Sequence, residues 1–211
     1  MSFRRQPASA LVLWAVFLAA AIIAVAVESM PQENAADIFN RWGLSAESLR
    51  EGRWWTLFSY GLLHGAWWHA LINLVAFRCL AFPTAAVRGT LPVLALLCLG
   101  VVAGGLAQVL ARPETTLVGM SGGLFALAVA ACLAWDPDDV ALRIGRWRLA
   151  RLRGRSLGYG FLGGALVLWA ASALSGNPGI MADECHAVGA IVGLLWYLLF
   201  WRTPHYSLTH R

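Results

Sequence analysis

The stretch GMSGGLFAL, Gly119 to Leu127, places a lone serine between glycines at the start of an apolar run. Other long apolar runs recur along a chain of 211 residues that is 59% hydrophobic and only 13% charged. A soluble globular domain is closer to half apolar and one quarter charged. The mean hydropathy is +0.65, so the chain has more apolar side chains than its own interior can bury. The composition therefore indicates a protein whose solvent is the lipid bilayer.

The uncharged runs predict six membrane-spanning helices. Backbone polar groups in lipid must be paired within their own segment, so each run should be helical. At roughly 1.5 Å per residue most runs can cross about 30 Å of hydrocarbon, although the fourth and sixth are short. The predicted spans are residues 10–27, 62–82, 91–111, 118–135, 157–174 and 186–201. We expect an all-α polytopic membrane protein with one domain over residues 1–211.

The arginines predict how the spans are oriented. All sixteen basic residues are arginine, and six of them lie between the fourth and fifth spans, from Arg143 to Arg155. Arg4 and Arg5 precede the first span, and Arg202 and Arg211 follow the last one. Arg78 and Arg88 flank the connection between the second and third spans. The positive-inside rule makes these segments cytoplasmic and places both termini inside. The first run also resembles a signal peptide, but the membrane-embedded remainder favours an uncleaved span.

The distribution of charge argues against nucleic-acid binding, and the cysteines have a structural explanation. The isoelectric point near 9.5 could suggest nucleic-acid binding, but the arginines lie in short connections and not on an amphipathic face, so no nucleic acid is expected. The cysteines lie in or beside apolar runs without CxxC spacing, which is typical of small core residues. They are Cys79, Cys98, Cys132 and Cys185.

The predicted topology brings the conspicuous polar residues to one side of the membrane. The second, fourth and sixth spans all begin on the non-cytoplasmic side. His64, His69 and Asn73 open the second span, Ser121 opens the fourth and His186 opens the sixth. Each residue alone has an ordinary structural explanation, such as a serine bonded to its own helix. Polar groups in spans usually face a protein interior or a wet cavity, so their convergence indicates a shared site.

The residue types at this site suit nucleophilic catalysis. A serine hydroxyl is a weak nucleophile unless a base takes its proton, and histidine has a suitable pKa. The negative charge of a tetrahedral intermediate needs fixed donors. The Asn73 amide, the His69 ring and the Ser121 backbone N–H can supply them. His69 and Asn73 are four residues apart and share a helix face, whereas His64 should play a different part.

Glycines near these residues allow close approach. Gly119, Gly122 and Gly123 flank Ser121 and leave the backbone open to a substrate at a tight helix start. Gly189 and Gly193 give the sixth span a small-residue face. That face should let the span approach the fourth closely enough for His186 to reach Ser121.

Three motifs now resemble a known family, the rhomboid intramembrane serine proteases. Gly119-Met120-Ser121-Gly122 is similar to the family's GxSG, His64-x4-His69-x3-Asn73 to its HxxxxHxxxN, and the segment from His186 to Gly193 to its HxxGxxxG. The resemblance extends from about Ala10 to Trp201. GxSG alone is a weak signal. All three motifs, in this order and on one predicted side of the membrane, are far more specific for the family.

The resemblance implies a role for each site residue. It implies a Ser121–His186 dyad without a third acidic member, and an oxyanion hole of Asn73, His69 and the Ser121 backbone N–H. It gives His64 a hydrogen-bonding structural role. Phe125 falls where the family often has a tyrosine that packs on the catalytic histidine, so it should support the ring without a hydrogen bond. No metal and no cofactor is implied.

The chain also departs from the family pattern. Many members carry a Trp-Arg pair in the first outer loop, where this chain has Trp55-Thr56 with Arg53 nearby, which puts the loop's anchoring in doubt. Cys185 stands where alanine is usual. The compact chain resembles the rhombosortase branch, which removes C-terminal glycine-glycine sorting tails in bacteria, but nothing in the sequence decides between that branch and a general rhomboid.

The expected function is that of an intramembrane serine endopeptidase. Its partners would be the lipid bilayer and a membrane-anchored protein substrate. The expected location is a bacterial inner membrane, with the active site open to the non-cytoplasmic side. The oligomeric state is not predicted.

Three alternative functions compete with this expectation. A non-catalytic rhomboid-like binder that escorts membrane proteins is one, although such relatives usually lack the serine or the histidine. A metal site using His64, His69 and His186 with Asp183 or Glu184 lacks HExxH-type spacing. A transporter would need a charged midplane site, which the sequence does not offer.

Overall fold

The computed structural model describes residues 9–134, 140–144, 147–152, 154–175 and 182–202. Its elements, in chain order, are α1 (Ser9–Glu28), α2 (Gln32–Trp42), α3 (Ala46–Arg50), α4 (Thr56–Ser59), the 3-10 turn η1 (Tyr60–Leu62), α5 (Trp67–Arg88), α6 (Thr90–Ala111), α7 (Ser121–Ala134), β1 (Val140–Ile144), β2 (Trp147–Leu152), α8 (Gly154–Ser175), α9 (Asp183–Trp196) and the π-helical turn η2 (Tyr197–Trp201).

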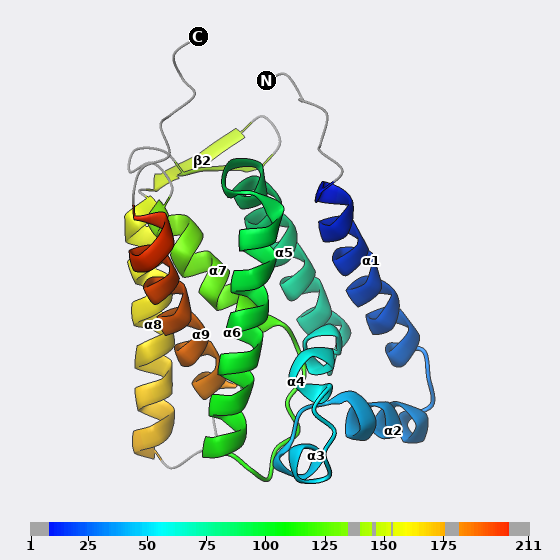
Figure 1. Ribbon diagram of the computed structural model, residues 1–211. Coiled ribbons are helices and arrows are strands. Elements are labelled where there is room, and N and C mark those ends of the chain that lie inside the picture. The colour runs from blue at the N-terminus through cyan, green and yellow to red at the C-terminus, as the bar shows by residue number, and fades with distance from the viewer. Residues whose placement is uncertain (1–8, 135–139, 145–146, 153, 176–181, 203–211) are drawn as a thin grey trace.

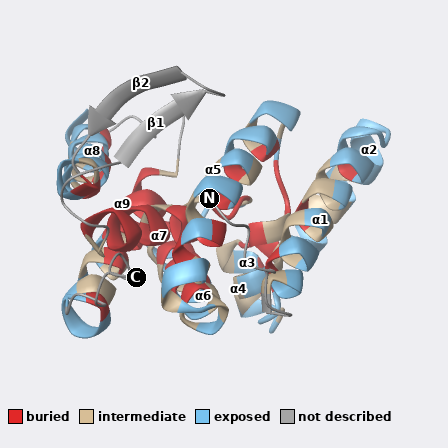
Figure 2. Cartoon of the chain, turned by 90° about the horizontal axis from the view of Figure 1, so that it is seen from above, coloured by how far each residue is buried: buried red, intermediate tan, exposed pale blue. Residues whose placement is uncertain are grey.

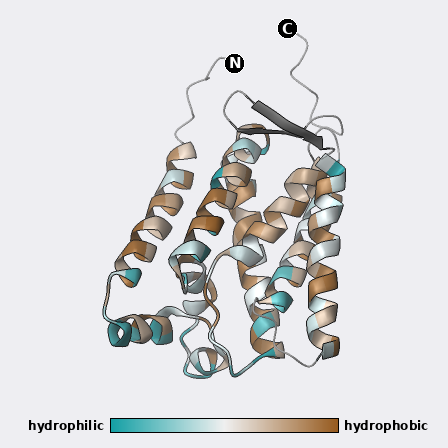
Figure 3. Ribbon diagram, turned by 180° about the vertical axis from the view of Figure 1, so that it is seen from behind, coloured by the Kyte–Doolittle hydropathy of each residue, from teal (hydrophilic) through white to brown (hydrophobic). Residues whose placement is uncertain are grey.

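The long helices run side by side along one bundle (Figure 1). The first turn of α1, the end of η2 and the β1–β2 hairpin lie at the same end of the bundle. The short helices α2, α3 and α4 lie at the opposite end. Apolar residues dominate the long helices, whereas polar residues gather at α2 (Figure 3). This distribution is that of an integral membrane protein with polar caps.

Five of the described helices are long and apolar enough to cross a membrane. They are α1, α5, α6, α8 and α9 extended by η2. Helix α7 is apolar but has only 14 residues, which span only about 21 Å. It is buried along most of its length and packs against α5, α6, α8 and α9 (Figure 2). Five of the six predicted spans therefore correspond to helices that are long and apolar enough to cross a membrane, and the fourth is a short helix enclosed by the others.

The predicted bounds of the second span, 62–82, are wrong at both ends. Helix α5 begins only at Trp67, because Ala66 is extended with φ −162° and ψ 152°. It continues through Pro83 and ends where Gly89 takes a φ of +90°. Apolar residues mark the membrane-embedded length of a chain but not the residue at which a helix begins. In consequence His64 precedes the helix and is not on it.

Two connections contain structure that the apolar runs did not predict. The segment from Glu28 to Gly61 holds α2, α3 and α4, and a reciprocal pair of hydrogen bonds between Ser45 and Ser48 caps α3. The arginine-rich connection holds β1 and β2, which pair antiparallel with a register shift between Leu142 and Arg143. The fold is a helical bundle, and this hairpin is the exception to the all-α prediction among the described residues.

Glycines bring α6, α7 and α9 into close contact. A Cβ added at Gly189 would collide with the carbonyl oxygen of Gly122, and one at Gly193 with that of Ala126. On α6, a Cβ at Gly104 would lie 2.7 Å from the carbonyl oxygen of Cys185. The predicted approach of the last span to the fourth, through Gly189 and Gly193, is therefore observed. It places the first turn of α9 beside the first turn of α7.

Candidate active site

Ser121 is the first residue of α7, and a tight turn that requires glycine leads into it. Gly119 has a φ of +107°, a conformation that residues with a side chain rarely adopt. Its N–H donates to the carbonyl of Tyr60 at 2.8 Å, which holds the turn against η1. The Ser121 side chain is half-buried at the helix start. The backbone thus presents this hydroxyl at the end of a helix, where it is open to a cavity.

His186 lies in the first turn of α9, and its Nε2 is 2.8 Å from Oγ of Ser121. With the ring proton on Nδ1, Nε2 can accept the serine proton. The imidazole also stacks on Phe125, with centroids 4.6 Å apart and planes 23° apart. A hydrogen bond and a stacked ring therefore fix the orientation of the imidazole beside the serine hydroxyl.

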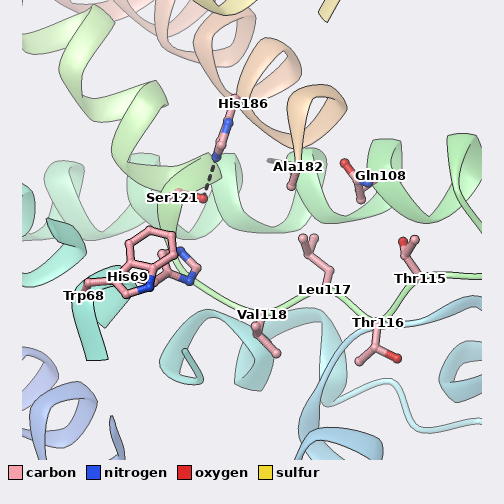
Figure 4. A pocket seen from close by; sticks show the side chains of 10 residues that line it. All are labelled: Trp68, His69, Gln108, Thr115, Thr116, Leu117, Val118, Ser121, Ala182 and His186. Atoms are coloured by element: carbon pink, nitrogen blue, oxygen red, sulfur yellow. Dashed lines mark hydrogen bonds between the residues drawn. The ribbon is translucent and has the colours of Figure 1, made fainter. Parts of the chain in front are cut away.

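The pair opens into a cavity of about 300 Å³. The residues that line it are Trp68, His69, Gln108, Thr115, Thr116, Leu117, Val118, Ala182, Ser121 and His186. Figure 4 shows His186 pointing at Ser121 from one side, with the ring of His69 on the other side. The segment from Thr115 to Val118 forms one wall. The cavity is large enough for one or two peptide side chains next to the serine.

The predicted oxyanion donors do not all reach this cavity. His69 lines it, and its ring packs so closely on Gly119 that a Cβ there would lie 2.8 Å from His69 Nε2. Asn73 is buried one turn along α5 and is not in the cavity lining. Its Nδ2 donates to the His69 carbonyl at 2.9 Å.

His64 is buried behind His69, with ring centroids 5.1 Å apart in an edge-on arrangement. Among the described residues neither of its ring nitrogens has a hydrogen-bond partner, so the hydrogen-bonding role implied for His64 stays a prediction. Burial, and next the proximity of His69, lowers the pKa of His64 to about 4. In the described part of the chain no three His, Cys, Asp or Glu side chains gather to hold a metal ion.

The loop before α5 is anchored without the family's Trp-Arg pair. Arg53 pairs with Glu51 at 2.7 Å and donates to the carbonyl of Asn40 at 2.5 Å. The buried Thr56 hydroxyl donates to the Arg53 carbonyl at 2.7 Å and contacts the Ser48 hydroxyl at 3.1 Å. Arg53 and Thr56 together therefore fix the loop where the sequence left its anchoring in doubt.

Gln108 is a site residue that the sequence analysis missed. It is buried on α6 and lines the cavity, and its Oε1 accepts the backbone N–H of Cys185 at 3.4 Å. A polar residue within the otherwise apolar run 91–111 was the available signal. Arg112 and Glu184, which form an ion pair beside the cavity, were also not assigned to it.

Comparison with known proteins identifies the family of the chain. A family model described as the Rhomboid domain matches residues 51–203, which include Ser121, His186, His69 and Asn73. A search of curated proteins gives no significant match. Because the family model covers well over half of the chain, this protein belongs to the rhomboid family.

Proposed function

We propose that the chain is an intramembrane serine endopeptidase that cleaves membrane-anchored proteins, with Ser121 as nucleophile and His186 as general base. Rhomboid family members are typically proteases of this kind. The observation that carries the proposal is the 2.8 Å contact between His186 Nε2 and Ser121 Oγ at the edge of an open cavity. A nucleophile within hydrogen-bond reach of an oriented base is the arrangement that serine hydrolysis requires.

The reaction would follow the two-step logic of serine hydrolases. Nε2 of His186 takes the Ser121 proton as Oγ attacks the scissile carbonyl. The resulting oxyanion is stabilised by the Ser121 backbone N–H and the His69 ring, and by Asn73 if its amide turns from the His69 carbonyl to the substrate. His186 then protonates the leaving amine. Water attacks the acyl-enzyme, and the same base takes its proton.

The wall of the cavity favours an extended substrate. The N–H and carbonyl of Leu117 both bond to Leu44, at 2.8 and 3.1 Å, and the Gly119 N–H bonds to Tyr60. Val118 lies between these two anchored residues and lines the cavity, so we propose that an extended substrate segment lies along it. A substrate helix must unwind to expose its scissile carbonyl, so helix-breaking or small residues near the cut are expected.

The membrane arrangement is part of the proposal. With the arginine-rich hairpin on the cytoplasmic side, both termini lie inside and the cavity opens on the non-cytoplasmic side, where water reaches Ser121. Residues 1–211 act as a single membrane domain, and a bacterial inner membrane is the proposed location. The exposed pairs Trp54-Trp55 and Trp67-Trp68 suit the lipid–water interface.

Labelling with a fluorophosphonate probe tests the proposal. The detergent-purified wild type should be labelled, whereas Ser121→Ala should not be and His186→Ala should be labelled far more slowly. Ser29→Ala, which removes an exposed serine that bonds to the Val25 carbonyl, is the matched control and should keep the label. A folded wild type that labels no better than Ser121→Ala would favour the non-catalytic binder instead.

A further inference from the structure

Arg112 follows the last residue of α6 and connects it to two other helices. Its Nε lies 3.1 Å from Oε1 of Glu184, in the first turn of α9. Its terminal nitrogen donates to Oγ of Ser172, in the last turn of α8, at 3.3 Å. One guanidinium therefore joins the end of α6, the end of α8 and the start of α9.

The backbone of Arg112 also shapes the cavity wall. Its carbonyl accepts the Thr115 N–H at 3.1 Å and the Thr115 hydroxyl at 2.9 Å. These bonds form the turn that leads into the segment from Thr115 to Val118. The residue that holds the start of α9 therefore also fixes one wall of the cavity.

Each charge of the Arg112–Glu184 ion pair depends on the other. The side chains of Arg112 and Glu184 are only 19% and 11% exposed, so removing either leaves a poorly solvated charge without its partner. Arg112 lies at the negative end of the α6 dipole and Glu184 at the positive end of the α9 dipole, which favours both charges. The Arg53–Glu51 pair, by contrast, lies in the outer loop with Glu51 53% exposed.

Glu184 is placed to act on the base. It stands two residues before His186 in the same helical turn. Between them Cys185 is buried, its N–H donates to Gln108, and its sulfur would lie 2.6 Å from a Cβ added at Gly122. A shift of Glu184 would therefore move this turn against α7 and change the distance from His186 to Ser121.

We infer that the Arg112–Glu184 ion pair is a positioning device that holds His186 within hydrogen-bond distance of Ser121. The inference rests on the proposed serine protease function. Neither residue lines the cavity, so each acts through the first turn of α9 and not on the substrate. A misplacement of about 1 Å at a catalytic base can lower a rate by about 100-fold.

The test is a double-mutant cycle on the full chain. The rate of acylation by the fluorophosphonate probe and the kcat and KM for a membrane-anchored reporter substrate are measured for Arg112→Ala, Glu184→Ala and the double variant. Each single variant should lower the acylation rate and kcat by about 10- to 100-fold with little change in KM. The double variant should be no slower than the worse single variant, because both remove one interaction.

Two further variants and a control complete the design. Exchanging the charges, Arg112→Glu with Glu184→Arg, should recover part of the acylation rate, which a general loss of folding would not allow. Arg112→Lys keeps the charge and provides a folded variant should the alanine forms unfold; it should fall between wild type and Arg112→Ala. Glu51→Ala removes the more exposed Arg53–Glu51 ion pair, which lies away from the cavity lining, and should acylate like wild type.

The outcomes separate this inference from the proposed function. If the wild type is labelled at Ser121 and both single variants acylate at its rate, the positioning role is wrong and the protease function stands. Additive losses in the double variant would also contradict a shared interaction. If the wild type is not labelled at all, the proposed function fails, and the positioning role fails with it.

Discussion

The imidazole of His186 lies on the phenyl ring of Phe125, with centroids 4.6 Å apart and planes 23° apart. Phe125 is one turn after Ser121 on α7, so the helix that carries Ser121 also supports the His186 ring. Phe161 of α8 packs edge-on against Phe125, at 6.3 Å between centroids. The orientation of His186 therefore depends on packing as well as on its hydrogen bond to Ser121.

Removing the Phe125 ring should slow the reaction without unfolding the protein. A stacked aromatic pair contributes roughly 0.5–1.5 kcal/mol, so Phe125→Ala should lower kcat by up to about tenfold. Phe125→Tyr keeps the ring and should retain near wild-type turnover. Turnover of a membrane-anchored reporter by both variants checks this, with thermal unfolding measured in parallel. Equal turnover by Phe125→Ala and wild type would show that the stack does not orient the base.

Closing the space at Gly189 should separate α7 from α9. The Cβ of Gly189→Ala would collide with the Gly122 carbonyl, and overpacking of this kind lowers stability by about 1–3 kcal/mol. The temperature of unfolding in detergent should fall, and acylation of Ser121 should fall with it.

Gly160→Ala is the matched control for this change. It also places an alanine in a helix, but a Cβ there meets nothing within 4 Å. Alanine is more favourable than glycine in a helix by about 1 kcal/mol. The unfolding temperature of this variant should therefore be no lower than that of wild type. Should Gly189→Ala behave in the same way, the contact between α7 and α9 would be looser than the Gly189–Gly122 approach indicates.

The site residues that the sequence predicted best are those set by spacing. Gly189 and Gly193 are four residues apart on α9 and follow His186 directly, so one small-residue face both brings α9 against α7 and positions the imidazole. Because the spacing of His186, Gly189 and Gly193 is local in sequence, it predicted which face of α9 packs on α7 and so the approach of His186 to Ser121.

The contacts that the sequence could not predict join residues distant in the chain. Whether Gln108 faces the cavity or the lipid depends on how α6 is rotated about its axis, which its nearly uniform apolar surface does not reveal. The same rotation decides which neighbouring helices Arg112, just after α6, can reach. The extended backbone at Ala66 and the short length of α7 could not be predicted for a related reason. Hydropathy indicates which residues lie in the membrane but not where a helix begins or ends. Only the packed bundle defines these features.

Acid should destabilise the fold through His64. Burial lowers its folded pKa to about 4, whereas an unfolded histidine titrates near 6.5. Above pH 6.5 both states are neutral and His64 has no effect on the pH dependence. As the pH falls from 6.5 to 4, only the unfolded chain binds the proton, and stability declines by up to about 3 kcal/mol.

The comparison with His64→Leu isolates this contribution. Thermal unfolding of both proteins between pH 7.5 and 4 should show a shallower decline for the variant, because leucine binds no proton. Parallel declines would mean that His64 is protonated as readily in the folded protein as in the unfolded chain. The position of His64 behind His69 would then be more hydrated than its burial indicates.

Substituting Gly119 should damage the site in a way that its backbone strain alone does not explain. Gly119→Ala adds strain at a φ of +107°, and its Cβ would also lie 2.7 Å from the His69 ring. Gly52 has a φ of +77° but open space around it, so Gly52→Ala adds only the strain. Both variants should lose about 1–2 kcal/mol of stability.

Only Gly119→Ala should also displace His69, and acylation of Ser121 measured on the folded fraction should then fall at least tenfold. If the two variants lose stability equally and both acylate normally, the ring of His69 has no part in stabilising the oxyanion.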